Sequence, residues 1–254
     1  MTFNALVLAG SRGGIDPVAE AAGVSAKALA TVAGEPMLAR VVAALRAAGA
    51  GRIAVSASDD EVAALARALG VEAIAAGPGP SGSAADGLAL LGAPLLLTTA
   101  DHALLEPDWI EHLLAHRSPG ADVAVMLARR EAIEAAVPDT RRTYLRFADG
   151  DWSGCNLFLL VTPDARRALQ LWTAVERDRK RPWRIVRRLG PGVLLRYVLG
   201  RLTLAEGVAL LGARAGAKAQ VVESPAGLAA VDVDKPDDLA LVRRIAEGDP
   251  AAGK

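Results

Sequence analysis

The sequence has few aromatic residues and a single cysteine. Phe, Trp and Tyr make up only 4% of the 254 residues, whereas 52% are hydrophobic and many of these are alanine. Ala-rich helices packed on a sheet fit this composition better than an all-β sandwich does. The one cysteine, Cys155, excludes an internal disulfide framework. It is compatible with a reducing compartment, so we expect a cytoplasmic protein in which this thiol is buried and inert.

An excess of charge of one sign and long hydrophobic runs are also absent. Lys and Arg together number 29, as do Asp and Glu, so the overall charge indicates neither a nucleic-acid nor a membrane partner. The longest apolar run, at 88–97, has ten residues, whereas a bilayer span needs about 20. No basic segment precedes the short apolar run at the N-terminus, which argues against a signal peptide. We therefore expect no transmembrane segment.

Strand-like and helix-like segments alternate along the first 120 residues. Short apolar runs predict buried strands at 3–9, 52–58, 71–77 and 94–100. The segments between these runs have apolar residues at helical spacing, and the connections are short. This pattern is typical of an α/β fold with a doubly wound, mostly parallel sheet.

The pattern changes after residue 120. Further strands are expected at 122–128, 143–149, 153–161, 218–224 and 228–234. The second and third of these are joined by a short polar turn, which predicts an antiparallel excursion. Residues 163–213 look helical, and a last helix begins at Pro236. We expect a single domain over 1–254, in which 163–213 is a helical, basic insertion.

A glycine-rich segment, Gly-Ser-Arg-Gly-Gly at 10–14, follows the first strand. Backbone N–H groups in such a loop suit an anion, and small residues let a phosphate come close. The dinucleotide fingerprint and the P-loop motif are both absent, which disfavours an NAD-binding oxidoreductase. On its own, the loop is compatible with a phosphate site and with a flexible turn.

Lys27 and the segment "ALATVAGEPML" that follows it make the phosphate site the better interpretation. Together with the first strand and its loop, they resemble the MobA-like nucleotidyltransferases, the molybdenum-cofactor guanylyltransferase group. Relatives of this group act on sugar phosphates and methylerythritol phosphate. The matching residues are Leu8, Ala9, Gly10, Gly13, Lys27, Gly34, Pro36, Met37 and Leu38. The resemblance implies a Rossmann-like fold of GT-A type, an NTP substrate, and Mg²⁺ or Mn²⁺ as cofactor.

Three later segments continue the resemblance in the same order. Gly82 and Ser83 correspond to a turn and helix start that read the base. Asp101, after the strand at 94–100, corresponds to a metal ligand. In "VDVDKPDDL", Asp234 corresponds to the second metal ligand, and Asp232 is the alternative. Two carboxylates are enough for Mg²⁺, which keeps several waters.

The resemblance also implies roles for the remaining site residues. Lys27 and Arg12 would be catalytic cations that offset phosphate charge, although the arginine usual in the family falls at or near Ile15. The acceptor would contact Asn156, Arg141 and Arg142. The nucleotide-binding residues would be Leu8, Ala9, Gly10, Ser11, Gly13, Gly14, Gly82 and Ser83. Structural alternatives are helix caps for Asp101 and Asp234 and a surface position for Lys27.

The stretch 177–201 is strongly basic, with nine cations and a single acid. It is compatible with a solvated helix face, or with a lid or platform for a polyanionic acceptor. It is also compatible with peripheral contact to anionic lipid. No RNA-binding motif supports nucleic acid as the partner.

We therefore predict a Mg²⁺-dependent nucleotidyltransferase. It would transfer an NMP group from an NTP to a phosphorylated or otherwise anionic acceptor, small or lipid-linked, and release pyrophosphate. One alternative is a catalytically altered nucleotide-binding module, suggested by Ile15. Another is a GT-A glycosyltransferase that uses a sugar nucleotide, although the D-x-D at 232–234 lies late in the chain for that class.

Overall fold

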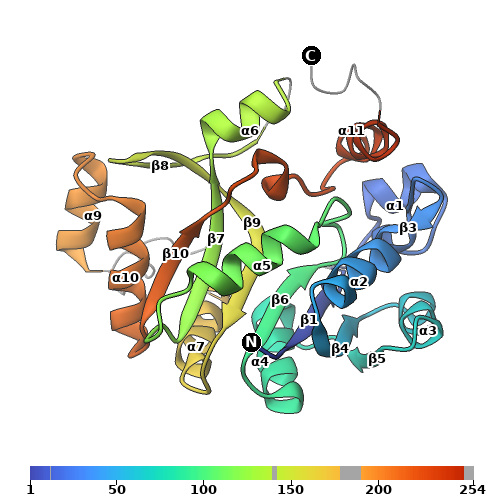
Figure 1. Ribbon diagram of the computed structural model, residues 1–254, viewed down its shortest axis with the longest axis horizontal. Helices are drawn as coiled ribbons and strands as arrows, with labels where there is room; N and C mark the ends of the chain where they lie inside the picture. The colour runs from blue at the N-terminus through green and yellow to red at the C-terminus, as the bar shows by residue number, and fades with distance from the viewer. Residues whose placement is uncertain (12, 139–141, 178–189, 249–254) are drawn as a thin grey trace.

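A central mixed sheet with helices on both faces organises the chain (Figure 1). The computed structural model describes residues 1–11, 13–138, 142–177 and 190–248. The strand order is β10-β7-β9-β6-β1-β4-β5, and β8 pairs with β9 off this path. The strands of this sheet are β1 (Phe3–Ala9), β4 (Ala50–Ala57), β5 (Glu72–Ala75), β6 (Leu95–Thr99), β7 (Val123–Arg129), β8 (Leu145–Phe147), β9 (Gly150–Leu160) and β10 (Ala219–Glu223). A small separate pair comprises β2 (Thr31–Val32) and β3 (Glu35–Pro36).

The helices cover both faces of the sheet, as a doubly wound fold requires. α2, α3 and α5 pack on one face, and α4, α7 and α10 pack on the other. The α-helices are α1 (Pro17–Ala22), α2 (Met37–Ala47), α3 (Asp60–Ala68), α4 (Gly79–Leu91), α5 (Pro107–His116), α6 (Arg130–Ala136), α7 (Ala165–Arg177), α9 (Pro191–Val198), α10 (Leu204–Ala215) and α11 (Pro236–Ala246). The 3₁₀ helices are η1 (Lys27–Leu29) and η2 (Gly227–Ala230).

β1 occupies the middle of the parallel part of the sheet, between β4 and β6. Its residues Ala5, Leu6 and Val7 are fully buried, as expected for a strand covered on both faces. Leu8 pairs with Thr99 of β6, and the N–H of Ala100 donates to the carbonyl of Leu8 at 3.0 Å. The segments that follow β1 and β6 therefore leave the sheet at the same edge.

The predicted antiparallel excursion is confirmed. β9 runs antiparallel to both β6 and β7, and β8 forms a hairpin with β9. The pairing of β7 with β9 shifts register between Val125 and Leu127, a β-bulge. Asn156, near this irregularity, has a φ of +50°, which is uncommon outside glycine.

The strand prediction for 228–234 is wrong. The segment begins as η2 and continues as an extended chain outside the sheet. Val231 and Val233 are buried while the aspartates between and after them are not, which produces the alternation that favoured a strand. α6 follows β7 directly and was not predicted. In the predicted helical region 163–213, α7, α9 and α10 are present, and residues 178–189 lie outside the described parts of the chain.

None of the described helices is long and apolar enough to cross a membrane.

Candidate active site

Lys27 lies at the start of η1, and its ammonium reaches two distant segments. Nζ of Lys27 is 2.5 Å from Oδ2 of Asp101 and 3.6 Å from Oδ1 of Asp234. It also donates to the carbonyl of Val233 at 3.2 Å. Burial lowers the pKa of Lys27, but the charge and hydrogen bond of Asp101 outweigh that effect and raise it above 10.5. The structure thus brings together the predicted catalytic lysine and both predicted metal ligands.

Asp101 follows β6, and its side chain is almost buried. Oδ2 accepts the hydrogen bond from Lys27, whereas Oδ1 is buried and has no hydrogen-bond partner among the described residues. The hydroxyl of Thr99 is likewise buried without a partner. Buried polar atoms of this kind are uncommon and need an explanation. The helix-cap alternative is wrong, because the N-cap of α5 is Glu106.

Asp234 is held near Asp101 by the backbone beside it. The N–H of Val233 donates to the carbonyl of Asp101 at 3.1 Å. Partial burial and the nearby carboxylate of Asp232 raise the pKa of Asp234 above 3.8, although Lys27 opposes this shift. Asp234 is not a helix cap either, because the N-cap of α11 is Lys235 and Asp238 accepts from its N–H at 2.9 Å.

Asp232, the alternative metal ligand, accepts a hydrogen bond at each of its carboxylate oxygens. Oδ1 accepts from Nη2 of Arg142 at 2.6 Å, and Oδ2 accepts from Nδ2 of Asn156 at 2.7 Å. Arg142 also donates to the carbonyl of Asp232 at 3.2 Å. Two predicted acceptor-binding residues therefore fix the backbone just ahead of Asp234, a pairing that sequence reasoning missed. Neither Arg142 nor Asn156 carried a sequence signal for this partner.

His102 lies directly after Asp101 but is buried and neutral. Burial lowers its pKa to about 4, despite the opposing charges of Asp232 and Asp101. Its ring stacks on Trp109 at 5.9 Å between centroids, and Nδ1 lies 3.4 Å from the hydroxyl of Thr98. His102 is therefore a buried neighbour of Asp101, and it adds no positive charge to the site at neutral pH.

The glycine-rich loop leaves β1 at the same edge of the sheet. Leu8 and Ala9 end the strand, and the backbone N–H of Ser11 donates to the hydroxyl of Ser58 at 2.9 Å. Gly13 and Gly14 have φ values of +76° and +91°, which glycine adopts readily. Gly10 through Gly14 remain a predicted nucleotide loop, and Arg12 and Arg141 lie outside the described residues.

Gly82 and Ser83 lie in the first turns of α4. The hydroxyl of Ser83 is buried, where it accepts from the N–H of Gly77 at 3.0 Å and from the hydroxyl of Ser56 at 2.8 Å. Gly82 packs closely against Pro78. These contacts hold the turn between β5 and α4, and base recognition by this turn stays a prediction.

The donors at Asp101 and Asp234 fit a hard divalent cation. The free Oδ1 of Asp101 and the largely exposed carboxylate of Asp234 are oxygen ligands, which Mg²⁺ prefers. Within the described ranges, no group of three or more His, Cys, Asp or Glu residues could hold a metal ion. Mg²⁺ typically takes one or two carboxylates together with substrate phosphates, so a two-carboxylate set is compatible with it.

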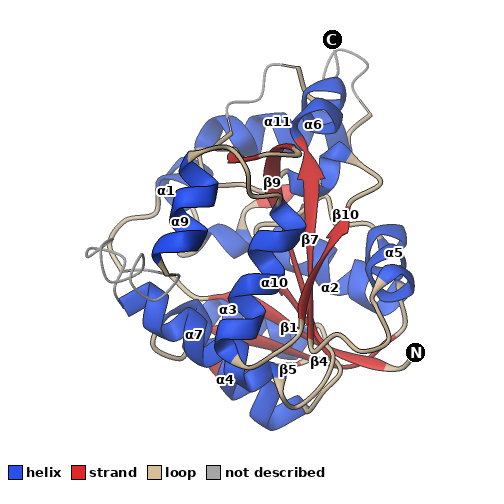
Figure 2. Ribbon diagram, turned by 90° about the vertical axis from the view of Figure 1, so that its left-hand side faces the viewer, coloured by secondary structure: helices blue, strands red, loops and turns tan. Residues whose placement is uncertain are grey.

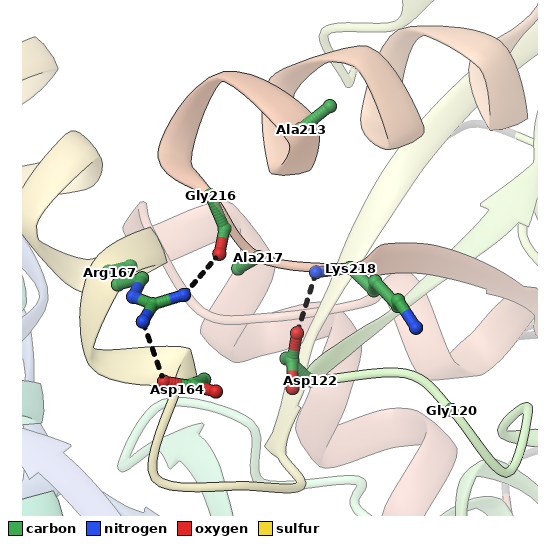
Figure 3. Close-up of a pocket in the computed structure, with 8 residues that line it drawn as sticks. All are labelled: Gly120, Asp122, Asp164, Arg167, Ala213, Gly216, Ala217 and Lys218. Carbon is green, nitrogen blue, oxygen red and sulfur yellow. Dashed lines mark hydrogen bonds and ion pairs between the residues drawn. The ribbon is translucent and has the colours of Figure 1, made fainter.

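A pocket of about 380 Å³ lies away from this site, at the other end of the strands, where β7 and β10 begin (Figure 3). Asp122 there accepts from the hydroxyl of Thr162 at 2.6 Å and from the N–H of Lys218 at 2.7 Å, and these bonds lower its pKa. Arg167 pairs with Asp164 and with the carbonyl of Gly216. Asp122, Asp164 and Arg167 each have a partner within the protein, which indicates a structural cluster. The lining residues are Gly120, Asp122, Asp164, Arg167, Ala213, Gly216, Ala217 and Lys218.

Sequence comparison matches residues 5–193 to the profile of the MobA-like NTP transferase domain. A 3-deoxy-manno-octulosonate cytidylyltransferase from Anaeromyxobacter dehalogenans (strain 2CP-C) is 37% identical over 106 residues. That match covers 39% of this chain and 44% of the relative, so the chain aligns with less than half of the relative's length. A second such enzyme, from Anaeromyxobacter sp. (strain Fw109-5), is 36% identical over 106 residues and is covered to 43%.

Structural comparison gives matches over nearly the whole chain. A hypothetical transferase from Thermus thermophilus is 32% identical, with a TM-score of 0.80 over 94% of this chain and all of that one. A CMP:2-keto-3-deoxy-manno-octonic acid synthetase complexed with CTP has a TM-score of 0.60, at 19% identity, over 97% of this chain and 99% of that one. A 4-diphosphocytidyl-2C-methyl-D-erythritol synthase from Anaerococcus prevotii has a TM-score of 0.61 at 8% identity, over 97% and 98% of the two chains. The last two show a shared fold.

Proposed function

Because the chain belongs to the MobA-like NTP transferase family, we propose that it transfers an NMP group from an NTP to an anionic acceptor and releases pyrophosphate. The observation that carries the proposal is the convergence of Lys27, Asp101 and Asp234. These residues come from three distant segments, at the edge of the sheet where the glycine-rich loop also leaves β1. In this arrangement the lysine and the glycine-rich loop would bind the triphosphate, and the two carboxylates would bind its cation.

In the proposed enzyme, Asp101 and Asp234 hold Mg²⁺ or Mn²⁺. When bound, the cation neutralises charge that develops on the α-phosphate oxygens and on the departing pyrophosphate. We assign the second ligand to Asp234 and not to Asp232, because each oxygen of Asp232 already accepts a hydrogen bond, from Arg142 or from Asn156. Asp232 acts instead as a positioning residue for the chain that carries Asp234.

The chain's own groups bind and orient the reactants. Lys27 exchanges part of its contact with Asp101 for the β- and γ-phosphates, and the backbone N–H groups of 10–14 hold the same phosphates. Arg12 is proposed to add a second cation. If the acceptor is a phosphate or a similar anion, its nucleophilic oxygen is already deprotonated. Positioning then carries most of the catalysis, without a strong general base.

The acceptor is proposed to bind beside Asn156 and Arg142. The side chain of Arg142 keeps 13% of its surface exposed beside Asp232, and its guanidinium would attract a phosphate or carboxylate on the acceptor. Arg141 is a further candidate next to it in the sequence. For the nucleotide, CTP is the first candidate, because two relatives are cytidylyltransferases and one structural neighbour is complexed with CTP.

Pyrophosphate release from each of the four NTPs, with Mg²⁺ and a pool of phosphorylated metabolites, tests the proposal. We expect release with one NTP, CTP first, and a loss of about 100-fold or more in Asp101→Asn, since a metal ligand contributes several kcal/mol. Asp108→Asn, which changes an exposed carboxylate in the first turn of α5, is the matched control and should keep full activity. Nucleotide-dependent thermal stabilisation without release for any NTP would instead support an altered nucleotide-binding module.

A further inference from the structure

α7 carries a carboxylate to the turn between β5 and α4. Figure 2 shows α4 and α7 side by side, and their buried residues belong to one apolar cluster. At the C-terminal end of α7, Oε2 of Glu176 accepts from the hydroxyl of Ser81 at 2.6 Å and from the backbone N–H of the same residue at 3.3 Å. Ser81 lies in the first turn of α4. Glu176 therefore ties the end of α7 to the start of α4, across 95 residues of sequence.

Both sides of this contact are fitted to each other. Gly79 has a φ of +81°, and a Cβ atom there would overlap Oε1 of Glu176, so a side chain at this position would displace the carboxylate. Ser81 is fully buried. On α7, Trp172 lies one turn before Glu176 on the same helix face, and its ring stacks on Phe158 of β9 at 6.0 Å between centroids. That stacking fixes the direction in which Glu176 leaves the helix.

The turn that Glu176 holds lies beside the glycine-rich loop. β1, β4 and β5 are parallel neighbours, so the loop after β1 and the turn after β5 leave the sheet at the same edge. Gly10 lies against Ala76, since a Cβ atom on Gly10 would be 3.4 Å from the Cβ of Ala76. Ligands of open α/β sheets bind outside this edge, at the carboxyl ends of the strands. The turn therefore borders the region where the nucleotide is proposed to bind.

We propose that Glu176 is a positioning residue for the nucleotide, because it holds the turn at 77–83 in the conformation that receives the base. This inference rests on the proposed transferase function and on the predicted reading of the base by this turn. Ser83 fixes the turn from the sheet, through the hydroxyl of Ser56, and Glu176 fixes it from α7. Groups that are held before the ligand arrives lose less conformational entropy when it binds. Glu176 thus acts on the nucleotide through Ser81.

A merely structural contact between α7 and α4 predicts a different result. Its loss would lower the melting temperature of the nucleotide-free protein, and any effect on nucleotide affinity would be the same for all four NTPs. A turn that reads the base should instead lose affinity mainly for the preferred NTP, because only that base makes the full set of contacts. The preference among the four NTPs therefore separates the two roles.

Isothermal titration calorimetry of the full chain with CTP, UTP, ATP and GTP, each with Mg²⁺, tests the proposal. Glu176→Ala removes the carboxylate, and Ser81→Ala removes the hydroxyl that donates to it. Glu176→Gln is the conservative variant, since its amide oxygen can still accept from Ser81. Gln170→Ala is the matched control, because Gln170 is an exposed residue of the same helix. Circular dichroism and thermal unfolding without nucleotide check the fold of each variant.

We expect the wild type and Gln170→Ala to prefer one NTP, with CTP the first candidate. Glu176→Ala and Ser81→Ala should each bind that NTP about tenfold more weakly, the scale of one hydrogen bond to a charged group, and should bind the other three as the wild type does. The double variant Ser81→Ala/Glu176→Ala should be no weaker than either single variant, because both remove the same contact. Glu176→Gln should recover most of the affinity.

Three results would overturn the positioning role while leaving the transferase function in place. They are unchanged affinity in folded Glu176→Ala, an equal loss for all four NTPs, and a wild type that binds the four NTPs equally well. Failure of the wild type to bind any NTP would overturn the proposed transferase function itself, and this inference with it.

Discussion

The ammonium of Lys27 lies 2.5 Å from a carboxylate oxygen of Asp101, although 74 residues separate them in sequence. This lysine compensates the charge of an almost buried aspartate. The same two groups are those we propose for the triphosphate and its cation. The ion pair between Lys27 and Asp101 therefore stabilises the site with the same two groups that would bind the triphosphate and its cation.

Replacing Lys27 by Met should destabilise the protein. Asp101 would keep a largely buried charge without its partner, which typically costs about 3 kcal/mol when one member of such a pair is removed. The melting temperature should fall by about 6–12 °C for a chain of this size. Thermal unfolding at pH 7 measures this. The double variant Lys27→Met/Asp101→Asn should recover most of the loss, and no recovery would show that the two groups are not coupled.

The raised pKa of Lys27 gives this ion pair a defined pH range. Its stabilising contribution is fully present below the unfolded-state value of 10.5 and declines as pH rises through the higher folded-state value. Measurements between pH 6 and 9 should therefore show a constant contribution from Lys27.

Asp234→Asn should stabilise the metal-free protein slightly while it lowers turnover. Burial and the neighbouring Asp232 raise the pKa of Asp234, so its ionised form is less favourable in the folded protein. The gain should be only about 0.5 kcal/mol, or about 1–2 °C in melting temperature, because the side chain is largely exposed and screened by solvent. The difference should shrink as pH falls through the raised folded-state value and disappear below the unfolded-state value of 3.8, where the wild-type carboxyl is protonated in both states. A lower melting temperature for the variant at pH 7 would contradict this interpretation.

Asn156 combines an unusual backbone conformation with a hydrogen bond to Asp232, and two substitutions separate these effects. Its φ is +50°, and Nδ2 donates to Oδ2 at 2.7 Å. Asn156→Ala should cost about 2–3 kcal/mol, because it loses a charge-assisted hydrogen bond and keeps the strained φ. Asn156→Gly should cost about 1 kcal/mol less, because glycine adopts this φ without strain. Chemical denaturation of both variants provides the comparison, and equal losses would rule out a backbone contribution.

Gly227 permits the close packing of η2 against α6, just ahead of Asp232 and Asp234. A Cβ atom at this position would overlap the carbonyl of Ala132, which belongs to the backbone and cannot rotate away. Gly227→Ala should therefore destabilise the protein by more than about 2 kcal/mol. Gly192→Ala on α9 is the control, because nothing lies within 4 Å of a Cβ there. Similar unfolding midpoints for the two variants would exclude a tight contact at Gly227.

Cys155 should be unreactive in the folded protein. Burial raises the pKa of its thiol to about 12, so the nucleophilic thiolate is scarce and shielded at pH 8. Alkylation by iodoacetamide should be at least about 1,000-fold slower than in denaturant, because it requires opening of the structure. The neutral thiol also implies that stability declines as pH rises from about 9 towards 12. Rapid modification of the native protein at pH 8 would show that Cys155 is accessible.

The sequence was most informative where a candidate site residue follows a strand. A buried run such as 94–100 predicts the strand, and the aspartate directly after it predicts where a carboxylate leaves the sheet. Since β1 and β6 are parallel neighbours, the loop after β1 and Asp101 share an edge. Composition does not relate these segments to one another. The family resemblance did so, because it matches them in the same order along the chain.

Tertiary partners account for what the sequence did not predict. The segment 228–234 alternates Val and Asp as a strand does, but the N–H of Val233 bonds to the carbonyl of Asp101 outside the sheet. The distinction between Asp232 and Asp234 depends on Arg142 and Asn156, which lie at least 76 residues away in sequence. No local pattern encodes such partners.

The position of the cation in a complex with nucleotide shows most directly whether Asp101 and Asp234 hold it. Crystals grown with Mn²⁺ and a non-hydrolysable CTP analogue, or the analogue of whichever NTP proves active, would reveal the metal by its anomalous scattering. We expect an anomalous peak within about 2–2.5 Å of carboxylate oxygens from both Asp101 and Asp234, with nucleotide phosphates completing the coordination shell. Bound nucleotide with its cation away from these two aspartates would contradict it.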